Sequence, residues 1–530
     1  MASTFWLVRC PALGALTGLA LIGMLGTPSG AVLAQDEVCP QRGGTIKTVD
    51  MNYADMDPTA QIDPHSYIRM VYDSLIDVTM DLEYRPGLAV ELPEQVDDAS
   101  YVFKVREGVT FHDGTPFDAE AVKYNVDRIV AGDVVTPHTG LWREWLDSVT
   151  VIDPMTVRFD LKRPWPDFYW GVASTLFFAS PALLEKYGES YGTSAESTAG
   201  TGPFIMTAFA PKERIELKRN PDYYRESEPC VDGVVGTLIS SGSVRLLGLQ
   251  RGDLTNVYTF PESQLPLIEN ADGVVIEEGE ATTLTVLVVN TKHPALNDKR
   301  VRQAIQLAVD GQEIIDKVYR GRGLMVESLF PPWHDGFVKA SDLSPIRPDL
   351  DRAKALLAEA GYGPSKPLRL TLETYNAPAH VERSVLLQAQ LKRIGIETEV
   401  RNIPSGQAQQ NMLSGNFQLS LWQMNGGPSL IDYSWDLLSG ESGKNNTNYN
   451  KPGGYQNPEV EPLLTAIAQA PNAEAVQEEI AALQEIVFED VPYIYLNWRN
   501  HRDAWREELK NFKISKLKNF QDFRTVWFEQ

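Results

Sequence analysis

The segment between residues 101 and 129 shows clearly how the pattern of hydrophobic and polar positions changes along the chain. Its first part, YVFKVREGVTF, alternates apolar and polar residues and breaks at Glu107-Gly108, which predicts two short strands. A turn, HDGTP, follows, and Asp118 then takes an N-cap position before apolar residues recur at helical spacing. No Ser, Cys or second His lies at a catalytic spacing from His112, so we interpret this histidine as a turn residue.

Similar patterns recur through the rest of the chain. Strands are predicted at runs such as TVRFDL, RIELKR, LTVLVVN and PLRLTLET, and helices at DKRVRQAIQLAVD, DRAKALLAEAG and HVERSVLLQAQLKRIG. No low-complexity linker or short repeat separates these elements. The predicted fold class is therefore α/β, with helices and strands mixed throughout.

The first 34 residues have the layout of a secretory signal peptide. Arg9 precedes a run rich in Leu, Gly and Ala, and Val32-Leu33-Ala34 supplies small residues for cleavage. A transmembrane anchor is the weaker alternative, because the uninterrupted apolar run is short. We expect cleavage after Ala34 and export of the mature chain.

The three cysteines agree with an exported chain. Cys10 would leave with the signal peptide, while Cys39 and Cys230 would remain. In an oxidising compartment these two either pair or stay as free buried thiols, and their positions alone leave both open. We expect no lipid anchor, because Asp36, Glu37 and Val38 precede Cys39 instead of a run of small residues.

Length and charge narrow the function classes. The 530 residues are enough for two to four lobes, and the 43% apolar content is enough for their cores. The formal net charge is −23. A chain this acidic is a poor partner for nucleic acid or for an anionic membrane surface.

Sequence signatures of catalysis are missing. The chain has 7 His and lacks the H-E-x-x-H, C-x-x-C, G-x-S-x-G and G-x-x-x-x-G-K-[ST] patterns. Acidic pairs are numerous, but a solvated surface explains them better than a glycosidase site does. We predict no catalytic residue, metal site or cofactor, and we favour binding over turnover.

Several motifs in order, covering nearly the whole mature chain, resemble the large periplasmic solute-binding proteins of ABC importers. This is the family 5 group of receptors for oligopeptides, dipeptides, opines and nickel. The motifs are GGTIKTVD with DPTAQIDPHSYIRMVYDSL, FKVREGVTFHDGTPFDAEAVKYNVDR, GTGPFIMTAFAPKERIELKRNPDYY, NTKHPALNDKRVRQAIQLAVD, DLDRAKALLAEAGY and VPYIYLNWRNHRDAW.

The resemblance implies a two-lobed clamshell that closes around a ligand. Lobe I would span residues 35–285 with an inserted subdomain near 75–195, and would be completed by residues 500–530. Lobe II would span residues 290–495. Family members often pair an early Cys with one just after the NPDYY segment, which favours a Cys39–Cys230 disulfide.

The resemblance also places ligand contacts. Peptide-binding relatives hold the peptide's amino group with an Asp after a strand of lobe II, where this chain has Asn425 close to Trp422. Asp432 lies further on and is a candidate replacement. Dipeptide relatives meet the carboxylate with an Arg near the start of a helix, and here the candidates His380, Glu382 and Arg383 are displaced. Both departures weaken a dipeptide assignment, because a zwitterion needs a counter-charge for each end.

Further candidate contacts are aromatic or basic. Indole faces can stack on sugar rings or apolar side chains, and the candidates are Trp142, Trp145, Trp422, Trp435 and Trp498. Arg499 is either a counter-charge for an anionic ligand group or part of an ion pair between the lobes. Asn52 and Tyr53 lie where relatives often contact ligand.

We therefore expect a monomeric periplasmic receptor that delivers a peptide-like solute to an ABC permease of the inner membrane. An opine or a sugar conjugate is the alternative ligand. The alternative in a different class is a secreted hydrolase with an unrecognised carboxylate pair, and a role as chemoreceptor partner or chaperone is a third option.

Overall fold

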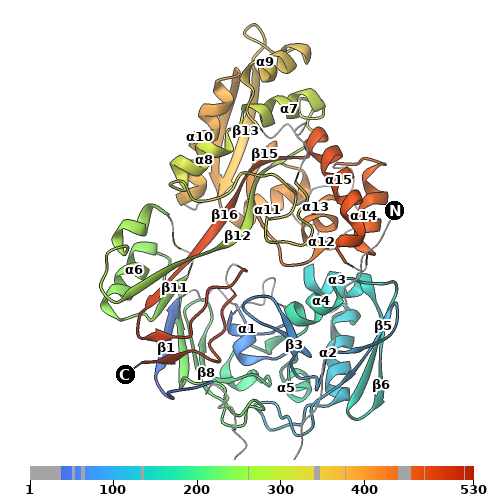
Figure 1. Cartoon of the computed structure of the whole chain (residues 1–530), viewed down its shortest axis with the longest axis vertical. Helices are drawn as coiled ribbons and strands as arrows, with labels where there is room; N and C mark the ends of the chain where they lie inside the picture. The colour runs from blue at the N-terminus through green and yellow to red at the C-terminus, as the bar shows by residue number, and fades with distance from the viewer. Residues whose placement is uncertain are drawn as a thin grey trace, which may run out of the picture. The chain divides into compact units, whose positions relative to one another are not determined.

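Two long strands, β12 and β16, run side by side through the structure (Figure 1). The computed structural model describes residues 38–49, 54–60, 66–132, 137–258, 260, 262–339, 347–375, 378–439, 455–470, 472–517 and 520–529. The expected signal peptide and the ligand candidates Asn52 and Tyr53 lie outside these ranges.

The two strands are part of a six-stranded sheet in the order β11-β16-β12-β15-β13-β14. Its bounds are β11 (Asn256–Tyr258), β12 (Val274–Val289), β13 (Leu368–Tyr375), β14 (Ile396–Ile403), β15 (Leu419–Asn425) and β16 (Tyr493–Arg506). We call the elements β1 to β11 with β17 and β18 the first lobe, and α7 to α15 with β13 to β15 the second lobe. β12 and β16 connect them.

Helices pack on both faces of this sheet in the second lobe. Alternation along β12 sends Leu287 and Val289 into one apolar cluster with α7 to α10, and Leu284 and Val286 into another with α14 and α15. The helices are α7 (Lys299–Ala308), α8 (Gly311–Val318), α9 (Leu350–Glu359), α10 (Pro378–Lys392), α11 (Ser405–Ser414), α12 (Leu430–Tyr433), α13 (Trp435–Leu438), α14 (Val460–Ala468) and α15 (Gln477–Asp490).

The first lobe contains two four-stranded sheets, ordered β1-β10-β9-β8 and β4-β5-β7-β6. Their strands are β1 (Thr45–Val49), β4 (Glu94–Asp97), β5 (Ser100–Lys104), β6 (Leu146–Asp153), β7 (Thr156–Leu161), β8 (Phe204–Ala210), β9 (Arg214–Arg219) and β10 (Gly233–Thr237). Two small sheets add β2 (Ile76–Val78), β3 (Tyr84–Pro86), β17 (Leu509–Lys510) and β18 (Trp527–Phe528). The helices are α1 (Ser66–Val71), α2 (Ala119–Ala131), α3 (Pro137–Trp145), α4 (Phe168–Thr175), α5 (Pro181–Tyr187) and α6 (Gly242–Arg251).

The segment 101–129 forms most of what its pattern predicts. The Asp118 carboxylate accepts a hydrogen bond from Ala121 N at 2.9 Å and caps α2. The predicted second strand is wrong, since Gly108 turns the chain at φ 77° and only an isolated bridge forms beyond it. His112 is part-buried at this turn with Nε2 2.9 Å from Gly202 O, and burial lowers its pKa to about 4.

Other expectations concern the cysteines, the surface and the lobe boundaries. Cys39 and Cys230 form a disulfide, which confirms the pairing that the resemblance favoured.

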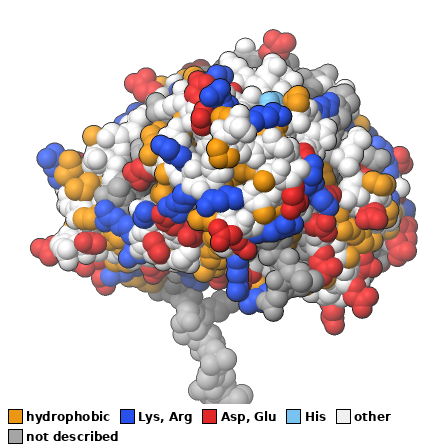
Figure 2. All heavy atoms as spheres, turned by 90° about the horizontal axis from the view of Figure 1, so that it is seen from above, with side chains coloured by type: hydrophobic (Ala, Val, Ile, Leu, Met, Phe, Trp, Pro, Cys, Tyr) orange, Lys and Arg blue, Asp and Glu red, His pale blue; other side chains and the backbone are white. Residues whose placement is uncertain are grey.

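Among the described residues, no helix is both long and apolar enough to span a bilayer. Figure 2 shows a face on which acidic and basic side chains are interspersed. The boundaries predicted near residues 285 to 290 and 495 to 500 fall in or beside β12 and β16, and they stay predictions.

Candidate functional site

Polar side chains form two rows across the centre of the six-stranded sheet. Pairing of β15, β12 and β16 aligns Asn425, Thr283 and Arg499 in one row. The next row on the same face aligns Gln423, Thr285 and Asn497. This face carries Leu287 and the second-lobe helices further along, so the polar rows begin where the apolar core ends.

Arg383, in the first turns of α10, lies over the second row with no exposed surface. Its Nη1 donates to Thr285 Oγ1 at 3.1 Å and its Nε donates to Ala379 O at 2.9 Å. Its Nη2 is buried and has no hydrogen-bond partner among the residues that the structure describes. Burial lowers the pKa of this guanidinium, and the positive charge of nearby Arg499 lowers it further, although Tyr319 acts in the opposite direction. A guanidinium stays charged even so, which makes its burial costly.

Arg499 is the second cation of the site and is half-buried. Its guanidinium carbon lies 5.8 Å from the centre of the Tyr319 ring, and that of Arg383 lies 5.6 Å from the same ring. Its Nε is buried, and no described residue accepts a hydrogen bond from it. In the described part of the chain, neither arginine has a carboxylate within 4.0 Å, so an ion pair between the lobes does not account for Arg499.

Aromatic rings adjoin the two cations. Tyr375, at the end of β13, contacts the His380 ring at 3.7 Å between centroids and meets the Trp422 ring edge-on at 5.4 Å. Trp422 is half-buried and leaves β15 on the face opposite Gln423. Burial raises the pKa of Tyr375, although the two arginines act in the opposite direction. The phenol therefore stays neutral at physiological pH and can donate a hydrogen bond.

The chemistry of this site is dominated by hydrogen-bond donors. Besides Arg383 Nη2 and Arg499 Nε, Gln423 Nε2 is buried without an acceptor among the described residues. The Asn425 side-chain oxygen accepts from Thr283 Oγ1 at 2.7 Å, which leaves its NH₂ group directed away from that bond. Such a set suits a group rich in acceptor oxygens, and a carboxylate above all. In the described ranges, no group of three or more His, Cys, Asp or Glu is placed to hold a metal ion.

The remaining predicted ligand residues lie in other surroundings. Trp142 and Trp145 are fully buried in the first lobe, where Trp142 Nε1 donates to Thr175 Oγ1 at 2.9 Å. Trp435 and Trp498 are buried in the same apolar cluster, with Trp498 edge-on to Tyr433 at 5.5 Å. Apolar packing surrounds all four rings, while the N–H groups of Trp145, Trp435 and Trp498 are buried without an acceptor among the described residues. A ligand role for these tryptophans stays a prediction.

Asp432 belongs to the short helix α12 rather than to the donor-rich face. Its Oδ2 accepts from Gly427 N at 2.8 Å and shapes the turn after β15. Residues that the sequence did not single out are Thr283, Thr285, Tyr319, Tyr375 and Gln423. The two threonines do interrupt an apolar strand at alternate positions in ATTLTVLVVN, and this pattern indicates a polar patch on one face of the strand.

Comparison with known proteins identifies the family. The family model for bacterial extracellular solute-binding proteins, family 5, matches residues 83–446. The chain belongs to this family. A curated relative, the probable D,D-dipeptide-binding periplasmic protein DdpA of Escherichia coli K12, is 26% identical over 87% of this chain and 90% of its own.

Solved structures of family 5 show the same two-lobed fold. The oligopeptide-binding protein AppA of Bacillus subtilis, in complex with a nonapeptide, superposes with a TM-score of 0.81 at 23% identity, over 93% of this chain and all of its own. An unliganded open form of the murein tripeptide-binding protein MppA superposes with a TM-score of 0.69 at 20% identity, covering 92% and 97%.

Proposed function

We propose that this family 5 protein is a periplasmic receptor that binds a peptide-like solute between its lobes and delivers it to an ABC import permease. The receptor acts as a monomer and releases the solute chemically unchanged. Family membership and the peptide ligands in the names of its relatives support this role.

One observation carries the ligand class. Arg383 and Arg499 are cations in or beside a buried region, and no described carboxylate neutralises them. In a chain of net charge −23, most of the described arginines pair with carboxylates. A buried guanidinium nitrogen that has neither a carboxylate nor another acceptor is best explained by an anion that arrives with the ligand. We propose that a carboxylate of the solute binds to Arg383 and Arg499, with Asn425 and Gln423 donating to further oxygens.

Asn425 does not give the amino end of the solute a counter-charge as Arg383 and Arg499 give the carboxylate. The Asn425 oxygen already accepts from Thr283, and the remaining NH₂ group is a donor, which would repel an ammonium group rather than hold it. A peptide with a blocked or secondary amine, including the opine alternative, fits this arrangement as well as a free peptide does.

A thermal-shift screen of the purified protein with matched probes tests this proposal. The panel contains tripeptides with a free C-terminus, the same peptides as C-terminal amides, N-acetylated peptides and opines. A probe at about a hundred times its Kd should add about 2.7 kcal/mol of stability. We expect a raised Tm with free carboxylates, retained on N-acetylation and lost on amidation. Equal shifts with acids and amides would contradict the carboxylate site, and hydrolysis of a probe would contradict the receptor role.

A further inference from the structure

The two lobes contact each other directly through the loop that follows the candidate ligand strand β15. On the second lobe the contact comprises Gly427, Ser429, Ile431 and Trp435. On the first lobe it comprises Arg163, Asp167 and Trp170. We refer to these seven residues as the closure contact.

Hydrogen bonds at the centre of the closure contact run from one lobe to the other. Asp167 stands at the N-cap position of α4 but makes no side-chain cap bond to that helix. Its carboxylate instead accepts from Ser429 Oγ, and from Ile431 N at 3.4 Å. Ser429 Oγ in turn accepts from Ile431 N at 3.1 Å. The Asp167 carboxylate of the first lobe thus accepts hydrogen bonds from the start of α12 in the second lobe.

Glycine at position 427 is needed for space. Its φ is not in the left-handed region, so the backbone alone does not require glycine. A Cβ atom there would lie 2.5 Å from Cζ2 of Trp170, which is far inside van der Waals contact. The loop backbone therefore lies directly against the indole of the first lobe.

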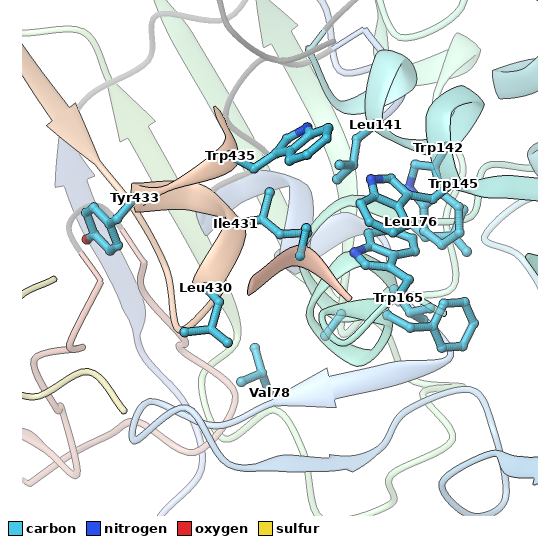
Figure 3. Packing of buried hydrophobic residues seen from close by; sticks show 14 of the residues in the cluster. Val78, Leu141, Trp142, Trp145, Trp165, Leu176, Leu430, Ile431, Tyr433 and Trp435 are labelled. Atoms are coloured by element: carbon cyan, nitrogen blue, oxygen red, sulfur yellow. The ribbon is translucent and has the colours of Figure 1, made fainter. Parts of the chain in front are cut away.

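Apolar packing extends the closure contact. Ile431 and Trp435 belong to the same buried cluster as Trp142, Trp145 and Trp165, and Figure 3 shows the two groups facing each other. The Arg163 guanidinium lies 4.2 Å from the Trp145 ring and 5.6 Å from the Trp435 ring, so it bridges an indole of each lobe.

The loop keeps its shape through bonds within the second lobe and to β12. Gly427 N donates to Asp432 at 2.8 Å, Gly426 N donates to Tyr433 Oη at 3.1 Å, and Tyr433 Oη donates to Thr282 O at 3.2 Å. These bonds do not depend on the first lobe. Separation of the lobes would break the closure contact and leave these bonds in place.

We infer that the closure contact is a latch that favours the closed arrangement before any solute binds. Contacts present only in the closed state stabilise it whether or not the site is occupied, and they raise the apparent affinity by increasing the closed population. The loop follows directly after Asn425, so the latch adjoins the donor-rich face and regulates that site. This regulation of ligand binding rests on the proposed function.

Small-angle X-ray scattering of the solute-free protein tests the latch without any ligand. D167A removes the acceptor of both hydrogen bonds, and G427A places a methyl group against Trp170. D147A, an exposed aspartate of the same lobe, is the matched control. We expect a larger radius of gyration for D167A and G427A, and wild-type values for D147A. Hydrogen exchange at the Ile431 amide should become about tenfold faster in D167A.

Either of two results would overturn the latch. One is an equal radius of gyration in all four proteins, and the other is expansion of D147A together with the latch variants. Circular dichroism confirms that each variant is folded before scattering is interpreted. A failure of every probe in the thermal-shift screen, combined with expansion of D167A and G427A, would reject the proposed ligand and leave the latch standing.

Discussion

Two regions of this protein bury arginine side chains, and they treat the charge in opposite ways. In the first lobe, Asp77 is 7% exposed and meets four guanidinium groups, at distances between 2.7 and 3.2 Å. These belong to Arg69, Arg85, Arg225 and Arg524. At the candidate site, Arg383 of the second lobe and Arg499 of the connecting strand β16 meet no described carboxylate.

Asp77 and its four arginines, which we call the Asp77 cluster, stabilise the fold of the first lobe. Burial alone would raise the pKa of Asp77, but the four guanidinium groups hold it well below its ordinary value. Arg524 comes from the C-terminal segment, 447 positions away, so the cluster ties the end of the chain to the first lobe. Each of its guanidinium groups is paired with the Asp77 carboxylate, although Arg69 Nε is buried without a hydrogen-bond partner among the described residues.

The Arg383 region shows the reverse. A buried cation without a counter-charge weakens the fold, and a protein that keeps one has a use for it. Burial of a charged side chain therefore does not by itself indicate a ligand site. A ligand site is indicated when the buried charge also lacks an oppositely charged partner.

The largest expected effect comes from removing the shared anion of the first lobe. D77A removes the carboxylate that four guanidinium groups share and should lower the free energy of unfolding by about 3 to 5 kcal/mol. Urea denaturation measures this change. The control is D81A, because Asp81 forms an exposed contact of 3.9 Å with Lys513, and its removal should cost about 0 to 1 kcal/mol. Equal losses in both variants would show that the cluster contributes no more than a surface pair.

A smaller effect concerns Asp73, which borders the same cluster. It accepts hydrogen bonds from Tyr223 and Thr201, and burial raises its pKa to about 6. Between pH 4 and 6 the folded protein then retains a proton that the unfolded chain has released. Stability from this group therefore falls as pH rises through that window, by up to about 3 kcal/mol, and is constant above it.

D73N cannot ionise and should lack this pH dependence. Urea denaturation of both proteins at pH 4, 5, 6 and 7 isolates it, because all other groups cancel in the difference. The wild type should lose stability relative to D73N as pH rises to 6. Parallel curves would mean that Asp73 titrates alike in both states.

The extent to which the sequence predicted these features depends on how local they are. The cap at Asp118 and its helix follow from neighbouring residues, and they were predictable. The strand expected around Val109 failed because this stretch bonds to the turn directly after it, through an isolated bridge between Thr110 and Pro116, and not to a neighbouring strand. The disulfide came from resemblance, since spacing alone left free thiols open.

The candidate site was harder to predict. Arg383, Thr285 and Gln423 come from three elements, and only the strand register brings them together. Sequence pattern marks a strand but not its neighbour's register. The tryptophans were the weakest signal, because an indole is as common in a core as in a cleft, and Trp142 is entirely buried.

The last prediction contrasts Arg383 with the Asp77 cluster. R383M replaces a buried unpaired charge with an apolar side chain of similar length, so unfolding stability should be unchanged or higher. Binding of a free-carboxylate peptide that shifts the wild-type Tm should weaken about 100-fold, or about 2.7 kcal/mol, because a charge-assisted bond is lost. R499M should weaken it about tenfold, since Arg499 is half-exposed and more of its charge is screened.

Isothermal titration calorimetry measures both affinities, and urea denaturation measures stability. R401M is the control, because Arg401 is exposed and already paired with Glu399 at 2.9 Å. Loss of binding with stability retained would separate Arg383 from the Asp77 cluster, where the loss falls on stability. A variant R383M that unfolds more easily and binds normally would place Arg383 among the structural arginines and leave the donor-rich face without its principal cation.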